Sequence, residues 1–253
     1  MGPGNTSIAL YYRVAETLKG RIASARYSPE NILPPENNLA QEFNVSNITI
    51  RKAMALLVEQ GLVARRRGIG TQVVDLREDR IPLKITGNFS DWVDSAINRS
   101  LRLEVEVLGI SVVSCPFSIA NKLGLPNRSP IWELKRLRKR NGEATSYYLN
   151  YTPSDLLHGA SKKDFTKESF IDIFQRKTGL RAAKISQQVE VVVADLDLGA
   201  ILGVGFGTPI FFVTNTYFTP ENTPLWVTQM YFRGDRYVYQ GDIYLEGQKA
   251  KGG

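Results

Sequence analysis

The segment "NVSNITIRKAMALLVEQGLVARRRGIGTQVV", residues 44–74, constrains the fold more than any other part of the chain. Its apolar residues recur at the spacing of one buried helix face, and they are Ile50, Ala53, Met54 and Leu57. Ser46 precedes this stretch as a natural N-cap, and Gly61 follows it as a helix stop. The residues after Gly61 predict two short strands around a glycine turn. The segment therefore predicts a helix followed by a hairpin with positive charge at its tip.

Two further helices are predicted before this segment, in "YYRVAETLKGRIASARY" and "PENNLAQEF". The first helix presents one apolar face, made of Tyr11, Val14, Leu18, Ile22 and Ala25. Pro29, Pro34 and Pro35 separate the two helices, because proline cannot continue a helix. Asn44 tolerates the left-handed conformation that ends the second helix sharply. Three helices before a basic hairpin are the pattern of a winged helix-turn-helix, whose recognition helix, here beginning at Asn47, enters the DNA major groove.

The hairpin tip places Arg65, Arg66 and Arg67 directly before Gly68. In a wing, such arginines neutralise phosphates, and a glycine lets the backbone approach the duplex closely. A solvated charged turn is the alternative, and the neighbouring helix-turn-helix favours the DNA interpretation. The recognition helix leaves a second group of residues on the face away from its core: Asn47, Ile48, Arg51, Lys52 and Ala55.

The composition fits binding better than catalysis. The net charge is +7, which suits nucleic acid or an anionic ligand but is too moderate to decide the matter alone. The only histidine, His158, and the only cysteine, Cys115, cannot build a zinc site of the usual type. A catalytic triad would need His158, which lies in a predicted surface loop. We therefore expect no catalytic residue, no metal and no cofactor.

The chain shows no apolar run of the roughly 20 residues that span a membrane, and its start lacks the pattern of a secretory signal. A single cysteine excludes an internal disulfide and fits a reducing compartment. These features predict a cytoplasmic protein without a membrane partner.

The hydrophobic pattern of the sequence changes at "DLREDRIP", residues 75–82. Helical periodicity dominates before it, and β-branched and aromatic runs alternate with turn signals after it. We predict an α+β chain with four parts, listed here in order: a winged helix-turn-helix domain at 8–75, a linker at 76–82, a second domain at 83–246 and a tail at 247–253.

In the second part, "PIWELKRLRKRNGEATSYYLNY" predicts a hairpin that turns at Asn141 and Gly142. Period-two alternation puts Arg136 and Arg138 on the same face as two apolar residues, Trp132 and Leu134. Buried arginines need an anion, which is either an acidic side chain of the protein or a ligand. An internal ion pair, a solvated sheet edge and a ligand site all remain open from the residues alone.

Ser169 opens the predicted helix "SFIDIFQRKTG". Its hydroxyl and the neighbouring N–H groups offer an anion site at the positive end of the helix dipole, and ordinary N-capping is the alternative. Asp195 and Asp197 suggest a paired acid and base, but beside "LGAILG" they are interpreted as caps of a short helix. Asp235 is interpreted as a residue that makes a structural turn bond.

The motifs "LPPENNLAQEFNVSNITIRKAMALLVEQGLV" and "RRRGIGT" resemble the DNA-binding domain of the GntR family of bacterial transcription regulators. The resemblance implies DNA contacts by Thr49, Arg51 and Gly68. The family often has arginine where this chain has Asn37 and Asn47. Arginine favours guanine and asparagine favours adenine, while Ile48 suits a thymine methyl, so we predict an A/T-weighted operator. The predicted DNA contacts are Asn37, Asn47, Ile48, Thr49, Arg51, Lys52, Arg66, Arg67 and Gly68.

The motifs "NFSDW", "ELKRLRKRNGEA", "KESFIDIFQRKTGL" and "MYFRGDRYVY" resemble the UTRA effector domain of the HutC-type subfamily. The resemblance implies a chorismate-lyase-like α/β fold with an antiparallel sheet, homodimers and a small-metabolite effector. It also implies that Arg136 and Arg138 line the acidic group of the effector. Phe89 and Ser90 match a family loop that closes over the effector, although a core role for Phe89 is the alternative.

Two positions depart from this second pattern: Tyr148 and Trp226 stand where family members often have a glutamate. Loss of both acidic groups argues against an amino-sugar phosphate, and aromatic residues with two arginines suit a flatter or more apolar carboxylate or phosphate. The predicted effector contacts are Phe89, Ser90, Arg136, Arg138, Tyr148 and Ser169.

These observations predict a homodimeric transcriptional regulator, most simply a repressor, that binds a near-palindromic DNA operator and responds to a small anionic effector. One alternative is a lyase or hydrolase on the same fold, which turnover of a bound ligand would indicate. Another is a wing that binds RNA or a protein, which salt-sensitive but sequence-blind binding would favour.

Overall fold

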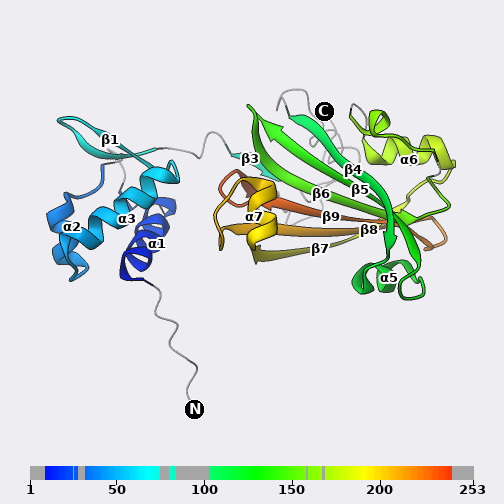
Figure 1. Ribbon diagram of the computed structural model, residues 1–253, viewed down its shortest axis with the longest axis horizontal. Helices are drawn as coiled ribbons and strands as arrows, with labels where there is room; N and C mark the ends of the chain where they lie inside the picture. Colours follow the sequence, from blue (N-terminus) through cyan, green and yellow to red (C-terminus); the bar gives the residue numbers. More distant parts are fainter. Residues whose placement is uncertain are drawn as a thin grey trace, which may run out of the picture. The chain divides into compact units, whose positions relative to one another are not determined.

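The computed structural model describes residues 9–24, 26–27, 32–74, 80–83, 103–157, 159–166 and 169–240. The chain divides into two compact units, residues 1–79 and 80–253 (Figure 1). Each unit has its own apolar core, and each is described by itself. In the described part of the chain, no helix is both long enough and apolar enough to cross a membrane.

In its described residues, the first unit contains three helices and a hairpin. The elements are α1 (Leu10–Ala23), α2 (Glu36–Glu42), α3 (Asn47–Glu59), β1 (Val63–Arg66) and β2 (Gly70–Val73). All four residues predicted to face inward from α3, Ile50, Ala53, Met54 and Leu57, are buried in this core. On α1, Val14 and Leu18 are buried and Ile22 packs against the core as predicted, whereas Tyr11 is exposed and Ala15 is buried in addition. Ala25, also predicted for this face, lies outside the described residues. This first unit has the predicted winged helix-turn-helix arrangement.

The turns of this unit follow local chemistry. Asn44 has a φ of 51°, the left-handed conformation predicted for the end of α2. Ser46 caps α3, since its side chain accepts a hydrogen bond from the Thr49 backbone N–H. Gly61, with a φ of 68°, turns the chain from α3 into the hairpin. The Leu33 N–H donates to the Thr71 carbonyl at 2.9 Å, which fixes the segment before α2 against β2.

The second unit is built on an antiparallel sheet. Within the described residues, six strands follow the order β4-β5-β6-β9-β8-β7. Their bounds are β4 Glu104–Ser114, β5 Pro130–Arg140, β6 Glu143–Pro153, β7 Lys184–Val193, β8 Pro209–Phe218 and β9 Pro224–Arg233. The predicted hairpin is β5-β6, and both turn residues have positive φ, 53° at Asn141 and 80° at Gly142. The predicted α+β class with an antiparallel sheet is confirmed.

Helices cover both faces of this sheet. They are α5 (Phe117–Leu123), the 3-10 helix η2 (Lys162–Phe165), α6 (Phe170–Thr178) and α7 (Leu196–Leu202). Side chains of η2 and α6 pack on the face that contains Trp132 and Leu134. α5 and α7 pack on the opposite face, against Ile131 and Leu137 respectively. The face covered by α6 is therefore the face that carries Arg136.

A short parallel pair joins the beginning and the end of this unit. β3 (Ile81–Leu83) pairs with β10 (Tyr237–Tyr239), and the Ile81 N–H donates to the Arg236 carbonyl at 2.8 Å. Residues 81 and 82, which were predicted to belong to a linker, are thus strand residues. Ile81 and Leu83 are buried, and Pro82 between them is exposed. Three residues are too few for the alternation to predict a strand from the sequence. The partner strand, more than 150 residues further along the chain, could not be predicted either.

Candidate functional sites

The N-terminus of α3 presents an exposed surface built around its cap. The Ser46 hydroxyl accepts from the Thr49 N–H at 3.2 Å and lies 2.9 Å from the Thr49 hydroxyl. Asn47 is exposed, and Ile48 is 67% exposed. An isoleucine so open to water has no role in the core of this unit, and its methyl groups suit an apolar partner such as a thymine methyl.

One carboxylate organises the charge beside this helix end. Arg51 Nε donates to one Glu36 oxygen at 3.3 Å, and Arg65 Nη2 donates to the other at 3.0 Å. Asn37 follows Glu36 and is exposed, as is Lys52 beside Arg51. The structure thus brings together residues from α2, α3 and β1. Sequence reasoning predicted DNA contacts for Asn37 and Arg51 but missed Glu36, which links Arg51 to Arg65.

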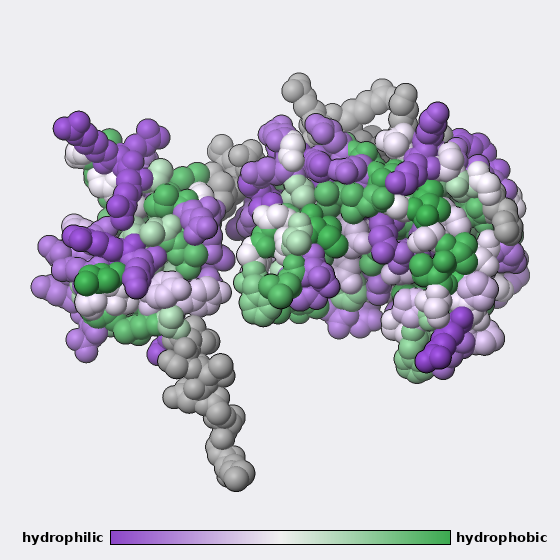
Figure 2. All heavy atoms as spheres, in the orientation of Figure 1, coloured by the Kyte–Doolittle hydropathy of each residue, from purple (hydrophilic) through white to green (hydrophobic). Residues whose placement is uncertain are grey.

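The wing tip is open. Arg66, Arg67 and Gly68 are exposed, and the Ile69 N–H closes the turn onto the Arg66 carbonyl at 3.1 Å. Gly68 has a φ of 78°, which a residue with a side chain would adopt only with strain. In Figure 2, which has the orientation of Figure 1, strongly hydrophilic residues lie on the visible surface of the β1-β2 hairpin. Among the described residues, neither Arg66 nor Arg67 has a carboxylate partner, in contrast to Arg65.

In the second unit, Arg136 is a buried cation whose charge lacks a carboxylate among the described residues. Arg136 is only 6% exposed, and its Nη2 donates a hydrogen bond to Asn150 Oδ1 at 3.1 Å. Its Nε is buried with no hydrogen-bond partner in the described part of the chain. Burial, and then the charge of Arg138, lower the pKa of Arg136 to about 9. The arrangement favours an anion close to this guanidinium.

Arg138 lies on the same face as Arg136, two residues further along β5. Its guanidinium carbon is 4.5 Å from the centre of the Tyr148 ring, a cation–π geometry. Tyr148 is buried and is the cross-strand partner of Arg136. The structure therefore brings three predicted effector contacts, Arg136, Arg138 and Tyr148, into one group.

A row of polar side chains continues from Arg136 across the same face. Asn150 Nδ2 donates to Thr228 Oγ1 at 2.8 Å, and on the next strands Gln187 Nε2 donates to Asn215 Oδ1 at 3.0 Å. Thr228 and Asn215 are cross-strand partners, so the row crosses from β5 to β7. Sequence reasoning missed Asn150. It lies two residues after Tyr148 in "SYYLNY" and therefore shares the face of the sheet that carries the arginines.

Apolar clusters border the polar row on both sides. One cluster contains Trp226 of β9 together with Phe170 and Phe174 of α6. The other contains Tyr148, Tyr237 and residues of β3. Trp226 is fully buried, with ring centres 4.2 Å from Tyr217 and 4.5 Å from Phe174. Trp226 is therefore a core residue, and the absence of a glutamate at this position has a packing consequence as well as a chemical one.

Ser169 is engaged in capping α6. Its hydroxyl accepts from the Asp172 N–H at 3.1 Å and donates to Asp172 Oδ2 at 2.6 Å. Of the two alternatives left by the sequence, the structure shows N-capping, and an anion at this helix end would meet the Asp172 carboxylate. Phe89 and Ser90, predicted to close over the effector, lie outside the described residues, as does His158.

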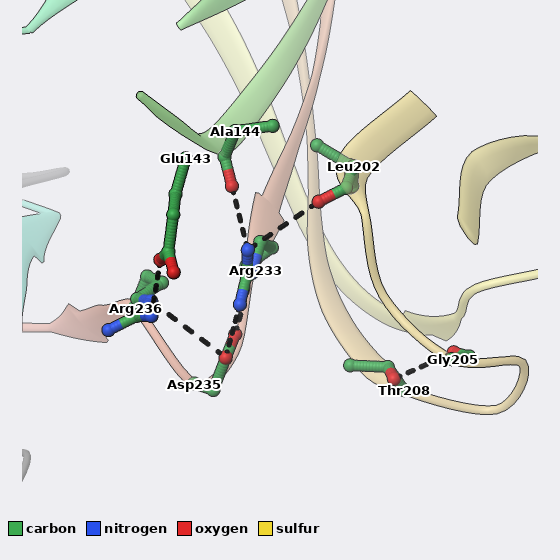
Figure 3. Close-up of polar contacts among 8 residues, drawn as sticks. All are labelled: Glu143, Ala144, Leu202, Gly205, Thr208, Arg233, Asp235 and Arg236. Atoms are coloured by element: carbon green, nitrogen blue, oxygen red, sulfur yellow. Dashed lines mark hydrogen bonds and ion pairs between the residues drawn. The ribbon is translucent and has the colours of Figure 1, made fainter. Parts of the chain in front are cut away.

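Asp195 and Asp235 both make structural bonds. Asp195 Oδ1 accepts from the Leu198 N–H at 2.7 Å and caps α7, as predicted. Asp197, which was predicted to be a cap as well, instead lies within the first turn of this helix. Asp235 binds Arg233 through both oxygens, at 3.0 Å from Nε and 2.7 Å from Nη2 (Figure 3). Within the described part of the chain, no group of three His, Cys, Asp or Glu residues is placed to hold a metal ion.

Comparison with known proteins assigns both units. Residues 10–73 match the model of the bacterial regulatory proteins of the gntR family, and residues 98–238 match the UTRA domain. The HTH-type transcriptional regulator GgaR of Escherichia coli K12 is 30% identical over 91% of this chain and 89% of its own length. The HTH-type transcriptional repressor NagR of Bacillus subtilis is 25% identical over 92% and 93%.

The crystal structure of PhnF from Mycobacterium smegmatis has the same fold. It superimposes with a TM-score of 0.57 and 20% sequence identity, covering 92% of this chain and all of that one. The fold of this chain is therefore shared with that structure over nearly its whole length.

Proposed function

The chain belongs to the GntR family of bacterial regulatory proteins and carries a UTRA domain, and from this premise we propose that it is a cytoplasmic transcriptional repressor modulated by a small anionic effector. It binds as a homodimer to a near-palindromic operator, with the two recognition helices in successive major grooves. The name of its relative NagR as a repressor supports the sign of the regulation. Relatives named as regulators support a binding function over an enzymatic one.

The observation that carries the effector proposal is the uncompensated charge of Arg136. A buried cation is expensive unless an anion neutralises it. The described residues supply only the neutral amide of Asn150. A carboxylate or phosphate of a ligand would neutralise the charge of Arg136 and Arg138 together.

The rest of the site restricts the ligand. Tyr148 presents an aromatic ring beneath Arg138, and no glutamate lies at this position to bind the hydroxyls or amine of a sugar. We therefore propose a flat or partly apolar carboxylate or phosphate, bound by Arg136, Arg138 and Tyr148 with the help of Phe89, Ser90 and Ser169. Tight binding of glucosamine 6-phosphate in a calorimetric titration would contradict this ligand class.

On the DNA side, the exposed residues of α3 and the wing supply the contacts. Asn47 and Ile48 at the start of α3 read bases, together with Thr49, Arg51 and Lys52. Asn37 reaches from α2. Arg66, Arg67 and Gly68 at the wing tip bind the phosphate backbone. Asparagine and isoleucine in place of arginine favour half-sites weighted toward A/T.

The site also suggests how the effector acts. Tyr148, beneath Arg138, belongs to the apolar cluster that holds Ile81 and Leu83 of β3. β3 is the first described strand after the DNA-binding unit, so a ligand that moves Tyr148 changes the packing of the segment that leads to that unit. The effector can shift DNA binding only by binding the two arrangements with different affinity.

The test is a selection of bound duplexes from random DNA with the purified protein, read by sequencing. The proposal predicts an enriched near-palindrome with A/T-weighted half-sites. Anionic metabolites are then screened for a change in binding to that duplex. G/C-rich half-sites would contradict the roles of Asn47 and Ile48. Salt-sensitive binding without any enriched motif would contradict operator recognition, and turnover of a bound metabolite would indicate an enzyme.

A further inference from the structure

We propose that Glu36 determines DNA specificity by positioning: its carboxylate holds Arg51 of the recognition helix and Arg65 of the wing, and so prevents both from binding phosphates indiscriminately. The inference rests on the DNA-binding function proposed above. It adds a residue that does not itself need to contact DNA, and it assigns an acidic residue a role within a basic surface.

The geometry joins three elements through one side chain. Glu36 is the first residue of α2, directly after the cap residue Pro35. One oxygen accepts from Arg51 Nε at 3.3 Å, and the other accepts from Arg65 Nη2 at 3.0 Å. The partners lie 15 and 29 residues further along the chain, one on α3 and one on β1. Glu36 therefore fixes the direction of both guanidiniums relative to α2.

Stability does not explain this arrangement. The Arg51 side chain is 71% exposed and that of Arg65 is 57% exposed. Exposed ion pairs contribute only about 0–1 kcal/mol to folding, because water screens the attraction and the long side chains lose freedom. The unit already has a closed apolar core formed by its three helices and β1. The positions of the two guanidiniums, on the exposed side of α3 and on the wing, point to a role in the surface that meets DNA.

Among the described residues, the two terminal nitrogens of Arg51 make no hydrogen bond, because the only side-chain hydrogen bond of Arg51 is that of Nε. Since Nε is occupied by Glu36, the guanidinium offers a base edge its Nη1 and Nη2 end, in a direction set by the carboxylate. Orienting a base-reading arginine before DNA arrives lowers the freedom that it loses on binding. Glu36 thus favours the one duplex whose base edges match this direction.

The charge of Glu36 acts in the other sense on wrong duplexes. A carboxylate between two arginines reduces their joint charge from +2 to +1 and repels phosphate oxygens at the same surface. Non-specific binding depends almost wholly on phosphate neutralisation. Glu36 therefore weakens binding to non-operator DNA while it supports binding to the operator.

The experiment compares Glu36→Gln with the parent on two duplexes of equal length, the selected operator and a scrambled sequence. Affinities are measured by fluorescence anisotropy across a salt series. We expect scrambled DNA to bind about threefold more tightly to the variant, with a steeper salt dependence, because about one more phosphate contact forms. We expect operator affinity to fall, so that the ratio of the two affinities drops by about tenfold, within the range of one base-reading contact.

Two control variants separate charge from position. Glu59→Gln removes the same charge at the other end of α3, where Glu59 is exposed. It should raise both affinities alike and leave their ratio unchanged. Glu36→Asp keeps the charge but shortens the side chain, so it should lower operator affinity without raising affinity for scrambled DNA. Circular dichroism checks that each variant remains folded.

The outcomes distinguish this inference from the function on which it rests. A parent that binds both duplexes equally refutes operator recognition itself. A parent that prefers its operator, with Glu36→Gln and Glu59→Gln changing the ratio by the same amount, refutes the role of Glu36. A ratio that falls in Glu36→Gln alone, with Glu36→Asp weakening only the operator, supports it.

Discussion

Arg136 and Arg233 are both buried in the second unit, 6% and 9% exposed, but their surroundings differ. Arg233 binds both oxygens of Asp235 and donates to the carbonyls of Ala144 and Leu202 (Figure 3). Arg136 has one amide partner, Asn150, and a buried Nε without any among the described residues. An arginine that is paired with a carboxylate of the chain supports the fold. An arginine buried without one destabilises the fold and is available to an anion from outside.

The largest test of this contrast is Asp235→Asn, which leaves the buried Arg233 without its counter-charge. Breaking a buried pair costs several kcal/mol; since the Asp235 side chain is 36% exposed, we discount that to a loss of about 2–3 kcal/mol. Urea unfolding followed by tryptophan fluorescence measures it. All three tryptophans, Trp92, Trp132 and Trp226, lie in residues 80–253, so the signal reports on this unit.

The same variant has a defined pH dependence. Burial alone would raise the pKa of Asp235, but the hydrogen bonds and charge of Arg233 outweigh it and hold that pKa below its usual value. A carboxyl with a lowered folded pKa contributes stability above its unfolded pKa of about 4, and this is lost as the pH falls further. The difference between parent and variant should therefore shrink below about pH 4. Glu143→Gln, which removes the 58% exposed partner of Arg236, is the control, with an expected loss of less than about 1 kcal/mol.

Arg136→Met tests the other side of the contrast, and the expected sign is opposite. With its pKa lowered to about 9, the charged form of Arg136 destabilises the folded chain throughout the range below that pH. Replacing it by an apolar residue of similar length should stabilise the ligand-free unit by about 1–2 kcal/mol, after the loss of the bond to Asn150. The measurement is again urea unfolding at neutral pH. A loss of stability comparable to that of Asp235→Asn would remove the contrast.

An anion should separate the two arginines further. Titrated phosphate, or a metabolite found in the screen, should raise the melting temperature of the parent, because a ligand that binds only the folded state stabilises it. Arg136→Met should lose this response, whereas Asp235→Asn should retain it from a lower starting temperature. Equal responses in the parent and Arg136→Met would show that the anion binds elsewhere.

Sequence reasoning succeeded where neighbouring residues decide the structure. The cap at Ser46, the turn at Asn44 and the hairpin at Asn141 follow from local chemistry and were predicted. The face shared by Arg136 and Arg138 follows from the two-residue period of a strand.

Sequence reasoning failed where the partner is distant in sequence. Glu36 meets Arg65, 29 residues away, and Arg233 meets the Ala144 carbonyl, 89 residues away. Such pairs depend on how elements pack, and a single sequence has no period or motif that encodes them. For Arg136, the sequence left three explanations open: an internal ion pair, a solvated sheet edge and a ligand site. The structure favours a ligand because strand register places an amide, Asn150, within reach of this guanidinium and no carboxylate among the described residues.

Arg67→Ala extends the comparison to an exposed arginine of the first unit. Because Arg67 is exposed and has no carboxylate partner among the described residues, its removal should leave stability within about 0.5 kcal/mol of the parent. If it binds phosphate at the wing tip, the salt dependence of DNA binding should become shallower by about one contact, equally for operator and scrambled duplexes. Salt titrations on both duplexes test this. A loss confined to the operator would instead make Arg67 a base-reading residue.

Two serines with the same local geometry extend the comparison to the helix caps of the two units. Ser46 and Ser169 each accept a hydrogen bond from the N–H three residues ahead, at 3.2 and 3.1 Å. Replacement of either by alanine should cost about 1 kcal/mol of stability in its own unit through loss of the cap.

Their other consequences should differ. Ser46→Ala frees the hydroxyl of Thr49 from its present partner and should alter operator affinity without affecting effector affinity. If Ser169 contacts the effector, Ser169→Ala should weaken effector binding. We expect the loss of affinity to be small, about twofold to fivefold, because the Asp172 carboxylate lies next to the serine hydroxyl and repels an anion. Calorimetric titration of both variants with the same anion measures the difference. Equal effector affinities in Ser46→Ala, Ser169→Ala and the parent would reduce Ser169 to a helix cap and leave the arginines of β5 as the anion site.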